Sequence, residues 1–121
     1  MAFTENMATR TYISGSAVAQ FTFVSLAADG QVDNTSANAR TDGVALMAAV
    51  GANEAITVAY DGRVTVQAGG TITRGAAVAV GTSGKAKAAA STNVIVGYAL
   101  EAGVDGQIIT IELSRADKAA A

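Results

Sequence analysis

Residues that could carry chemistry are few in this chain, and their types exclude most catalytic arrangements. The chain contains no His and no Cys, so a Ser-His-Asp triad, a thiolate nucleophile and a His or Cys zinc site are all impossible. The ten acidic residues are scattered, and none is marked as half of a general acid–base pair. Lys85 and Lys87 lie in no motif of Ser-Lys chemistry. We therefore predict a protein that is not an enzyme, with no cofactor and no metal site.

Four acidic residues precede Gly: Asp29, Asp42, Asp61 and Asp105. Carboxylates can ligate calcium, but none of the four has further ligands at alternate positions. Asp-Gly pairs favour tight turns, because Asp bonds to its own backbone and Gly tolerates positive φ. We interpret all four as turns, and the acidic pair of Asp29 with Asp33 is the one to check for a cation.

The segment at residues 81–86 superficially resembles a phosphate-binding loop. The pattern fails because Ala79 stands where the first Gly belongs, and Ala86 stands where Ser or Thr must bind magnesium. We interpret this segment as a hairpin turn.

Lys85 and Lys87 lie two residues apart, which places them on one face of a strand predicted at residues 85–88. They form either a solvated edge that discourages aggregation or a candidate docking surface for an acidic protein. The three tyrosines, Tyr12, Tyr60 and Tyr98, could anchor an interface. Since aromatic residues make up only 5% of the chain, the core interpretation is favoured for them.

The elements that would position these residues are β-strands. Short β-type runs alternate with turns rich in Gly, and no window shows helical spacing over three turns. The strongest hairpin signal is Asp61-Gly62 between runs at residues 55–60 and 63–67, which fits a type I′ turn. The polar stretch at residues 31–42 is typical of a surface loop. We predict an all-β fold, a small Gly-rich antiparallel β-barrel or sandwich with flexible N- and C-terminal ends.

Two segments resemble each other within the chain. Residues 43–58 and 97–111 both contain Gly-x-Ala-Leu, a small-residue turn, then Ile-Thr and a β-branched residue. The similarity reflects either convergence on strand–turn–strand chemistry or two equivalent ribbons placed symmetrically. Both interpretations predict a strand pair at each segment.

Length and composition set the remaining limits. With 121 residues we expect a flexible N-terminal arm at residues 1–9, one β domain at 10–113 and a flexible tail at 114–121. A net charge of −2 with eight basic residues argues against nucleic-acid binding. We expect no signal peptide and no membrane span, so the chain is predicted to be made in the cytoplasm. Its core of small side chains suggests stabilisation by assembly.

Four segments of the second half form a recognisable pattern: the Gly-rich strand–turn–strand run at 62–80, Gly84-Lys85-Ala86, the run at 96–102 and the closing strand at 106–113. With these segments the chain resembles the capsid cement, or decoration, proteins of tailed bacteriophages. The resemblance covers residues 10–113 and is best in the second half. The motifs are structural, and no active site is implied.

The resemblance implies a structural virion protein on the capsid exterior. Such a protein would bridge neighbouring subunits of the major capsid protein, as a homotrimer, without nucleic-acid or membrane partners. The candidate capsid-contact arm is Phe3, Thr4, Glu5 and Asn6, which could add a strand to an exposed edge. The alternative is a β-rich binding module of a phage head fibre or surface layer that recognises glycan or a host surface.

Overall fold

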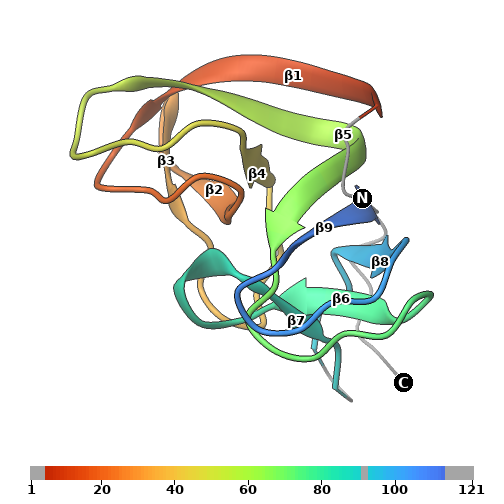
Figure 1. The fold of residues 1–121 in the computed structure, drawn as a ribbon. Coiled ribbons are helices and arrows are strands. Elements are labelled where there is room, and N and C mark those ends of the chain that lie inside the picture. The colour runs from red at the N-terminus through yellow and green to blue at the C-terminus, as the bar shows by residue number, and fades with distance from the viewer. Residues whose placement is uncertain (1–4, 91–92, 114–121) are drawn as a thin grey trace.

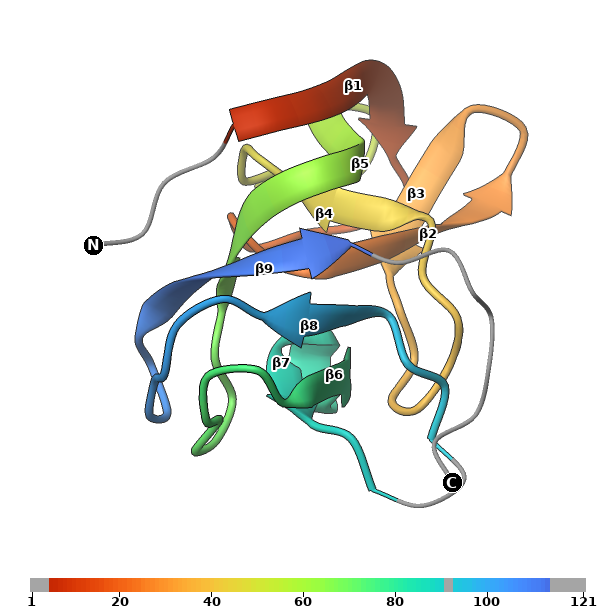
Figure 2. The same ribbon diagram turned by 90° about the vertical axis from the view of Figure 1, so that its right-hand side faces the viewer.

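The computed structural model describes residues 5–90 and 93–113, and these residues form nine β-strands with no α-helix (Figures 1 and 2). The strands are β1 (Glu5–Ser14), β2 (Phe23–Ala28), β3 (Gln31–Asn34), β4 (Gly43–Ala45), β5 (Ala55–Gln67), β6 (Ala77–Val80), β7 (Ala86–Ala88), β8 (Gly97–Ala99) and β9 (Ile108–Leu113). A 3₁₀ turn, η1 (Thr82–Gly84), lies between β6 and β7. The all-β prediction is confirmed.

The strands form one sheet in the order β1-β3-β2-β4-β5-β9-β8-β6-β7. β1 also pairs with β5, which closes the first five strands of this row into a small barrel. All pairings between strands are antiparallel except β1 with β3, which run parallel where the barrel closes. The predicted antiparallel pattern therefore has one exception.

The strand pairing of the first half of the chain recurs in the second half. The pair Val24–Asn34 between β2 and β3 corresponds to Val78–Ala88 between β6 and β7, so both residue numbers rise by 54. The pair Phe23–Val44 likewise corresponds to Ala77–Tyr98. Hydrogen bonds outside the strands repeat as well, among them Val18 with Ala49 and Ile72 with Gly103.

The repeat assigns every strand of one half a counterpart in the other. The pair Tyr12–Ile56 of β1 with β5 corresponds to Val66–Ile109 of β5 with β9. In this pair the residue number of β1 rises by 54 and that of β5 rises by 53. The difference arises because one residue fewer separates β8 from β9 than separates β4 from β5. The first half of β5 thus plays the part of β9, and its second half plays the part of β1. We call residues 8–59 the N-terminal module and residues 62–113 the C-terminal module.

Figures 1 and 2 show the modules one above the other, with β5 running from the upper module into the lower one. The C-terminal module closes less completely than the N-terminal one, through the single parallel bridge between Ala68 and Ala86. That bridge is the counterpart of the Ser14–Val32 pair. The internal similarity seen in the sequence therefore extends over the whole described fold, and both segments are strand pairs as predicted.

Each module has its own core of small and β-branched side chains. The interior of the N-terminal module is formed by Val18, Val24, Val32, Ala45, Ala49, Ile56 and Val58. The C-terminal module has a larger cluster, which includes the counterparts Ile72, Val78, Ala86, Ala99, Ile109 and Ile111. Three buried residues of the N-terminal module, Phe23, Val44 and Ala59, also belong to this second cluster. The modules are therefore held together by an apolar interface as well as by β5.

The predicted hairpin at Asp61-Gly62 is wrong, because β5 continues through both residues. Gly62 has a φ of +97°, and the register with β1 shifts between Ala8 and Thr9, which pair with Asp61 and Ala59. A positive-φ Gly and a register shift are the marks of a β-bulge, which bends a strand without ending it. The bulge is where β5 passes from one module to the other.

Two polar segments also differ from expectation. Residues 31–34 of the predicted loop form β3, where Val32 is buried and Asn34 donates to Thr22 Oγ1 and the Phe23 carbonyl, at 3.0 and 3.2 Å. Residues 5–9 of the predicted arm belong to β1 and pair with β5. The hydrophobic pattern of β3 is weak, but one buried Val and polar side chains with hydrogen-bond partners are enough for a short strand. Residues 1–4 and the tail at 114–121 lie outside the described residues.

Candidate interaction surfaces

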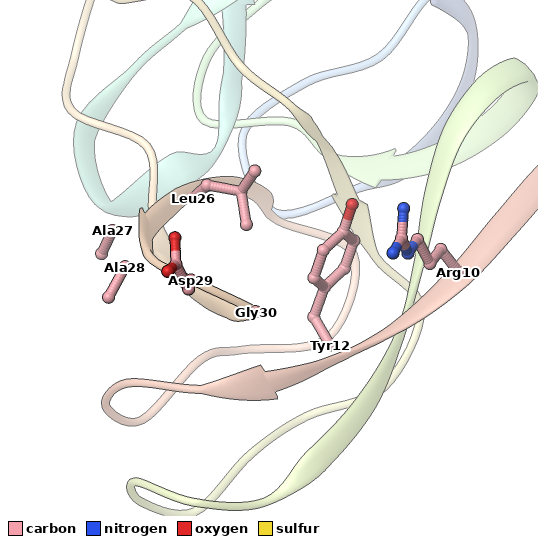
Figure 3. A pocket seen from close by; sticks show the side chains of 7 residues that line it. All are labelled: Arg10, Tyr12, Leu26, Ala27, Ala28, Asp29 and Gly30. Atoms are coloured by element: carbon pink, nitrogen blue, oxygen red, sulfur yellow. The ribbon is translucent and has the colours of Figure 1, made fainter.

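One surface feature of the N-terminal module is a groove between its strands. It has a volume of about 270 Å³ and is lined by Arg10 and Tyr12 of β1, Leu26 of β2, Tyr60 of β5, and Asp42. A neighbouring hollow of about 400 Å³ shares Arg10, Tyr12 and Leu26 and extends to the β2–β3 turn at residues 27–30. Figure 3 shows Arg10 and Tyr12 on one side of this hollow and Leu26 on the other.

Local contacts hold the groove residues in place. The guanidinium carbon of Arg10 lies 5.6 Å from the centre of the Tyr12 ring, within cation–π range. Asp42 Oδ2 accepts a hydrogen bond of 2.8 Å from the Leu26 backbone N–H. Leu26 is 49% exposed although its side chain is apolar. The groove thus combines a preformed shape, an apolar patch and charged groups at its rim, which suits a protein partner.

Lys85 and Lys87 lie beside a second hollow, of about 300 Å³, as neighbours on one face of the strand region. Its other lining residues are Gly69, Gly81, Thr82, Ser83 and Asp105. A Cβ added at Gly69 would lie 2.9 Å from Lys85 Cβ, so the Lys85 stem packs close against this glycine. Both lysines are half-buried. The structure brings the predicted docking residues together, and their role remains a prediction.

The candidate capsid-contact arm divides at the start of β1. Glu5 and Asn6 lie in that strand, with Glu5 opposite Arg63 of β5. Phe3 and Thr4 lie outside the described residues. Residues 5–9 of the predicted arm are therefore part of the sheet.

The core interpretation of the tyrosines is wrong for two of the three. Tyr60 and Tyr98 are 37% and 45% exposed, while Tyr12 is half-buried against the N-terminal core. The alternation of apolar and polar residues could not distinguish the two exposed tyrosines from the half-buried one. A strand residue on the outer face is buried only where another module covers it.

The described residues offer no arrangement for metal chemistry. Within them, no group of three or more acidic side chains lies close enough to hold a metal ion. The carboxylate of Asp33, one half of the acidic pair noted in the sequence, accepts a hydrogen bond of 2.6 Å from Ser16 Oγ.

No helix in the described part of the chain combines the length and apolar character needed to cross a membrane.

The fold defines a class of protein, a duplicated all-β module in which one bent strand serves both halves. A solved structure has this fold: the crystal structure of the N base of head fibre gp8.5 from bacteriophage phi29 matches with a TM-score of 0.76. The match covers 94% of this chain and 99% of that chain at 23% sequence identity. No protein-family model matches the chain, and the search of curated proteins gives no match.

Proposed function

We propose that this chain is a non-enzymatic structural protein of a bacteriophage particle, attached to the outside of the head. The observation that carries the proposal is the fold match to the N base of a phage head fibre, which spans nearly the full length of both chains. The sequence motifs at residues 62–80 and 96–113 add an independent resemblance to capsid decoration proteins, which also sit on phage heads. The chain is made in the host cytoplasm and assembles as a homotrimer on the major capsid protein.

The fold match favours a fibre base as the form of this attachment. A base needs a stable domain that fixes it to the capsid, and it needs no catalytic group. The β scaffold of two modules fits that role, and the absence of His and Cys is compatible with it. Recognition of a glycan or a host surface would be a role added to attachment.

A second candidate is cementing, in which the chain bridges neighbouring capsid subunits and stabilises the head. The motif resemblance favours it. The two lysines beside the hollow at Gly69 and Gly81 supply a surface that could face acidic groups of the capsid protein. Base and cement differ in one measurable respect, since a cement protein raises the stability of the head that carries it.

Cosedimentation with heads assembled from the major capsid protein of the same phage tests the proposal. We expect the native chain to sediment with the heads, and the Lys85→Glu/Lys87→Glu variant to bind roughly tenfold more weakly because its charges repel acidic groups. Arg74→Glu, an exposed charge reversal away from this surface, serves as the control. Removing residues 2–4, which leaves β1 intact, tests the remaining arm in the same assay.

The thermal stability of the decorated heads then separates the two candidates. An unchanged melting temperature of the heads supports a base, and a raised one supports cement. A native chain that stays in the supernatant at every concentration, or cryo-EM images of decorated heads without added external density, would refute head attachment.

A further inference from the structure

The interface between the two modules buries a stripe of the N-terminal module. Phe23, Val44 and Ala59 lie next to one another across β2, β4 and β5, because Phe23 pairs with Val44 and Val44 pairs with Ala59. All three have no exposed surface. They share one buried cluster with residues of the C-terminal module. The outer face of one module is therefore covered by the other.

Besides Val78, the counterpart of the interior residue Val24, the C-terminal module contributes four valines to this cluster. Val64 and Val66 of β5 and Val80 of β6 have no exposed surface, and Val96, just before β8, is 2% exposed. These four valines share one buried cluster with the stripe of the N-terminal module, and we call the face that they form the open end of the C-terminal module. The contact is heterologous, because the two modules use different faces.

The repeat assigns each of these valines a counterpart in the N-terminal module. Arg10 and Tyr12 correspond to Val64 and Val66, since their partners in the sheet, Val58 and Ile56, correspond to Ile111 and Ile109. Leu26 corresponds to Val80 by the pairing of β2 with β3 and of β6 with β7.

The fourth counterpart is Asp42, which corresponds to Val96. The Asp42 backbone N–H donates to the Val24 carbonyl, and the Val96 N–H donates to the Val78 carbonyl. The four counterparts are four of the five residues that line the 270 Å³ groove. The groove of the N-terminal module therefore occupies the same position as the open end of the C-terminal module. The stripe covers that open end, whereas neither module covers the groove.

The stripe also has a more exposed counterpart in the C-terminal module. Ala77, Tyr98 and Glu112 occupy the positions of Phe23, Val44 and Ala59, and they too lie side by side across three strands. Tyr98 is 45% exposed, Glu112 is exposed and Ala77 is half-buried. Within the described residues, neither module covers this groove or this stripe, and we call them the free groove and the free stripe.

We propose that the free stripe of one copy of this chain docks in the free groove of a second copy, repeating between chains the interface that joins the two modules within a chain. The groove and the stripe are exposed to water before two copies associate, and their residue types fit such surfaces. Valines of the internal interface are replaced by Arg10, Tyr12 and Asp42 in the groove, and Tyr98 takes the place of Val44 on the stripe. Tyr and Arg are enriched in protein interfaces, where they bury apolar area yet tolerate water.

Charge is compatible with a second copy as the partner. The groove carries the guanidinium of Arg10 and the carboxylate of Asp42, which lies 3.9 Å from Arg40. The stripe carries the carboxylate of Glu112, which lies 3.5 Å from Arg63 within its own chain, so both faces present both signs of charge. A heterologous contact of this kind generates a ring when the rotation closes. The proposal does not depend on attachment to a phage head, because it concerns contacts between copies of this chain alone.

Two surface variants test the proposal by analytical ultracentrifugation of the full chain. Leu26→Asp disables the groove, and Tyr98→Asp disables the stripe. Both side chains are about half exposed, so the fold of the single chain is expected to stay intact, which circular dichroism checks. We expect the native chain to associate as its concentration rises, and each variant to raise the dissociation constant about tenfold or more. Val50→Asp, at a position that is 89% exposed and outside both faces, is the matched control.

Mixing the two variants gives the sharper result. A Leu26→Asp chain keeps a working stripe and a Tyr98→Asp chain keeps a working groove, so the mixture should form one-to-one dimers and nothing larger. A mixture that stays monomeric, a native chain that is monomeric throughout, or an equal effect of Val50→Asp would overturn the proposal. A native chain that remains monomeric but binds a sugar in the groove would overturn it in favour of glycan recognition.

Discussion

At the scale of single residues, two glycines show most clearly how the fold depends on side-chain size. A Cβ at Gly43 would lie 2.5 Å from the carbonyl oxygen of Ala59, and a Cβ at Gly97 would lie 2.5 Å from that of Glu112. The two sites are repeat counterparts, so both modules need the same close approach of backbones. The sequence predicted a turn at Asp42-Gly43, but Gly43 lies within β4 and is required for packing rather than for turning.

Gly43→Ala and Gly97→Ala are therefore expected to destabilise the chain by a similar amount, about 1–3 kcal/mol each, because the backbone must move to admit a methyl group. Urea unfolding followed by circular dichroism measures the loss. Gly70→Ala, where a Cβ meets nothing within 4 Å, should change stability by less than about 0.5 kcal/mol. Equal effects at all three positions would contradict the packing role.

Residue-level function was only partly predictable. The lack of His and Cys excluded the catalytic arrangements that require those residues, and the spacing of Lys85 and Lys87 placed them on one face, as the structure has them. The groove was not predictable, because Tyr12 and Leu26 look like the core residues Val66 and Val80 in a sequence pattern. Only the fold shows that Val66 and Val80 have no exposed surface, whereas Tyr12 is half-buried and Leu26 is 49% exposed.

At the scale of elements, β5 is the strand on which the architecture depends. Its 13 residues pair with β1 and β4 in the first half and with β9 in the second. The Asp-Gly signal was read as a hairpin because positive φ at Gly is common to type I′ turns and to β-bulges. A hairpin and a bulged strand differ in which strands the residues before and after the Gly pair with. The local sequence does not specify that pairing.

Inserting Gly-Ser between Asp61 and Gly62 tests whether β5 is a continuous strand through these residues. In a hairpin loop, two extra residues would cost only about 0.6 kcal/mol or less. In a continuous strand they disrupt pairing with β1 at the bulge, so we expect a loss of about 2 kcal/mol or more. The same insertion after Asp29, in the true turn between β2 and β3, is the control. If both insertions were tolerated equally in thermal unfolding, the continuous strand would be ruled out.

Other elements show what decides whether a strand can be predicted. The strong runs at β5 and β9 were predicted because β-branched residues alternate over several positions. β3 was missed because it contributes a single buried side chain, Val32, while its polar residues bond to neighbouring segments. The turns at Asp29-Gly30 and Asp105-Gly106 were predicted correctly, and Gly30 and Gly106 have φ of +71° and +89°.

At the scale of the whole molecule, the chain is two copies of one small barrel design joined through an apolar contact. The short similarity between residues 43–58 and 97–111 was the visible trace of this duplication, while most equivalent positions share only size or burial. A thin core of Val, Ile and Ala stabilises little per module. Covering one open end with the next module buries more apolar surface. The contact proposed between chains would bury further surface, with more polar side chains such as Arg10 and Tyr12 in place of valines.

Cysteine cross-linking tests the head-to-tail contact most directly, because the native chain has no Cys. Leu26→Cys and Tyr98→Cys chains, one of them isotope-labelled, are mixed and treated with a short bis-maleimide, and the products are weighed by mass spectrometry. We expect covalent dimers of mixed mass, in which residue 26 of one chain is joined to residue 98 of another. Dimers of equal mass, or no cross-link at concentrations where the native chain associates, would contradict it.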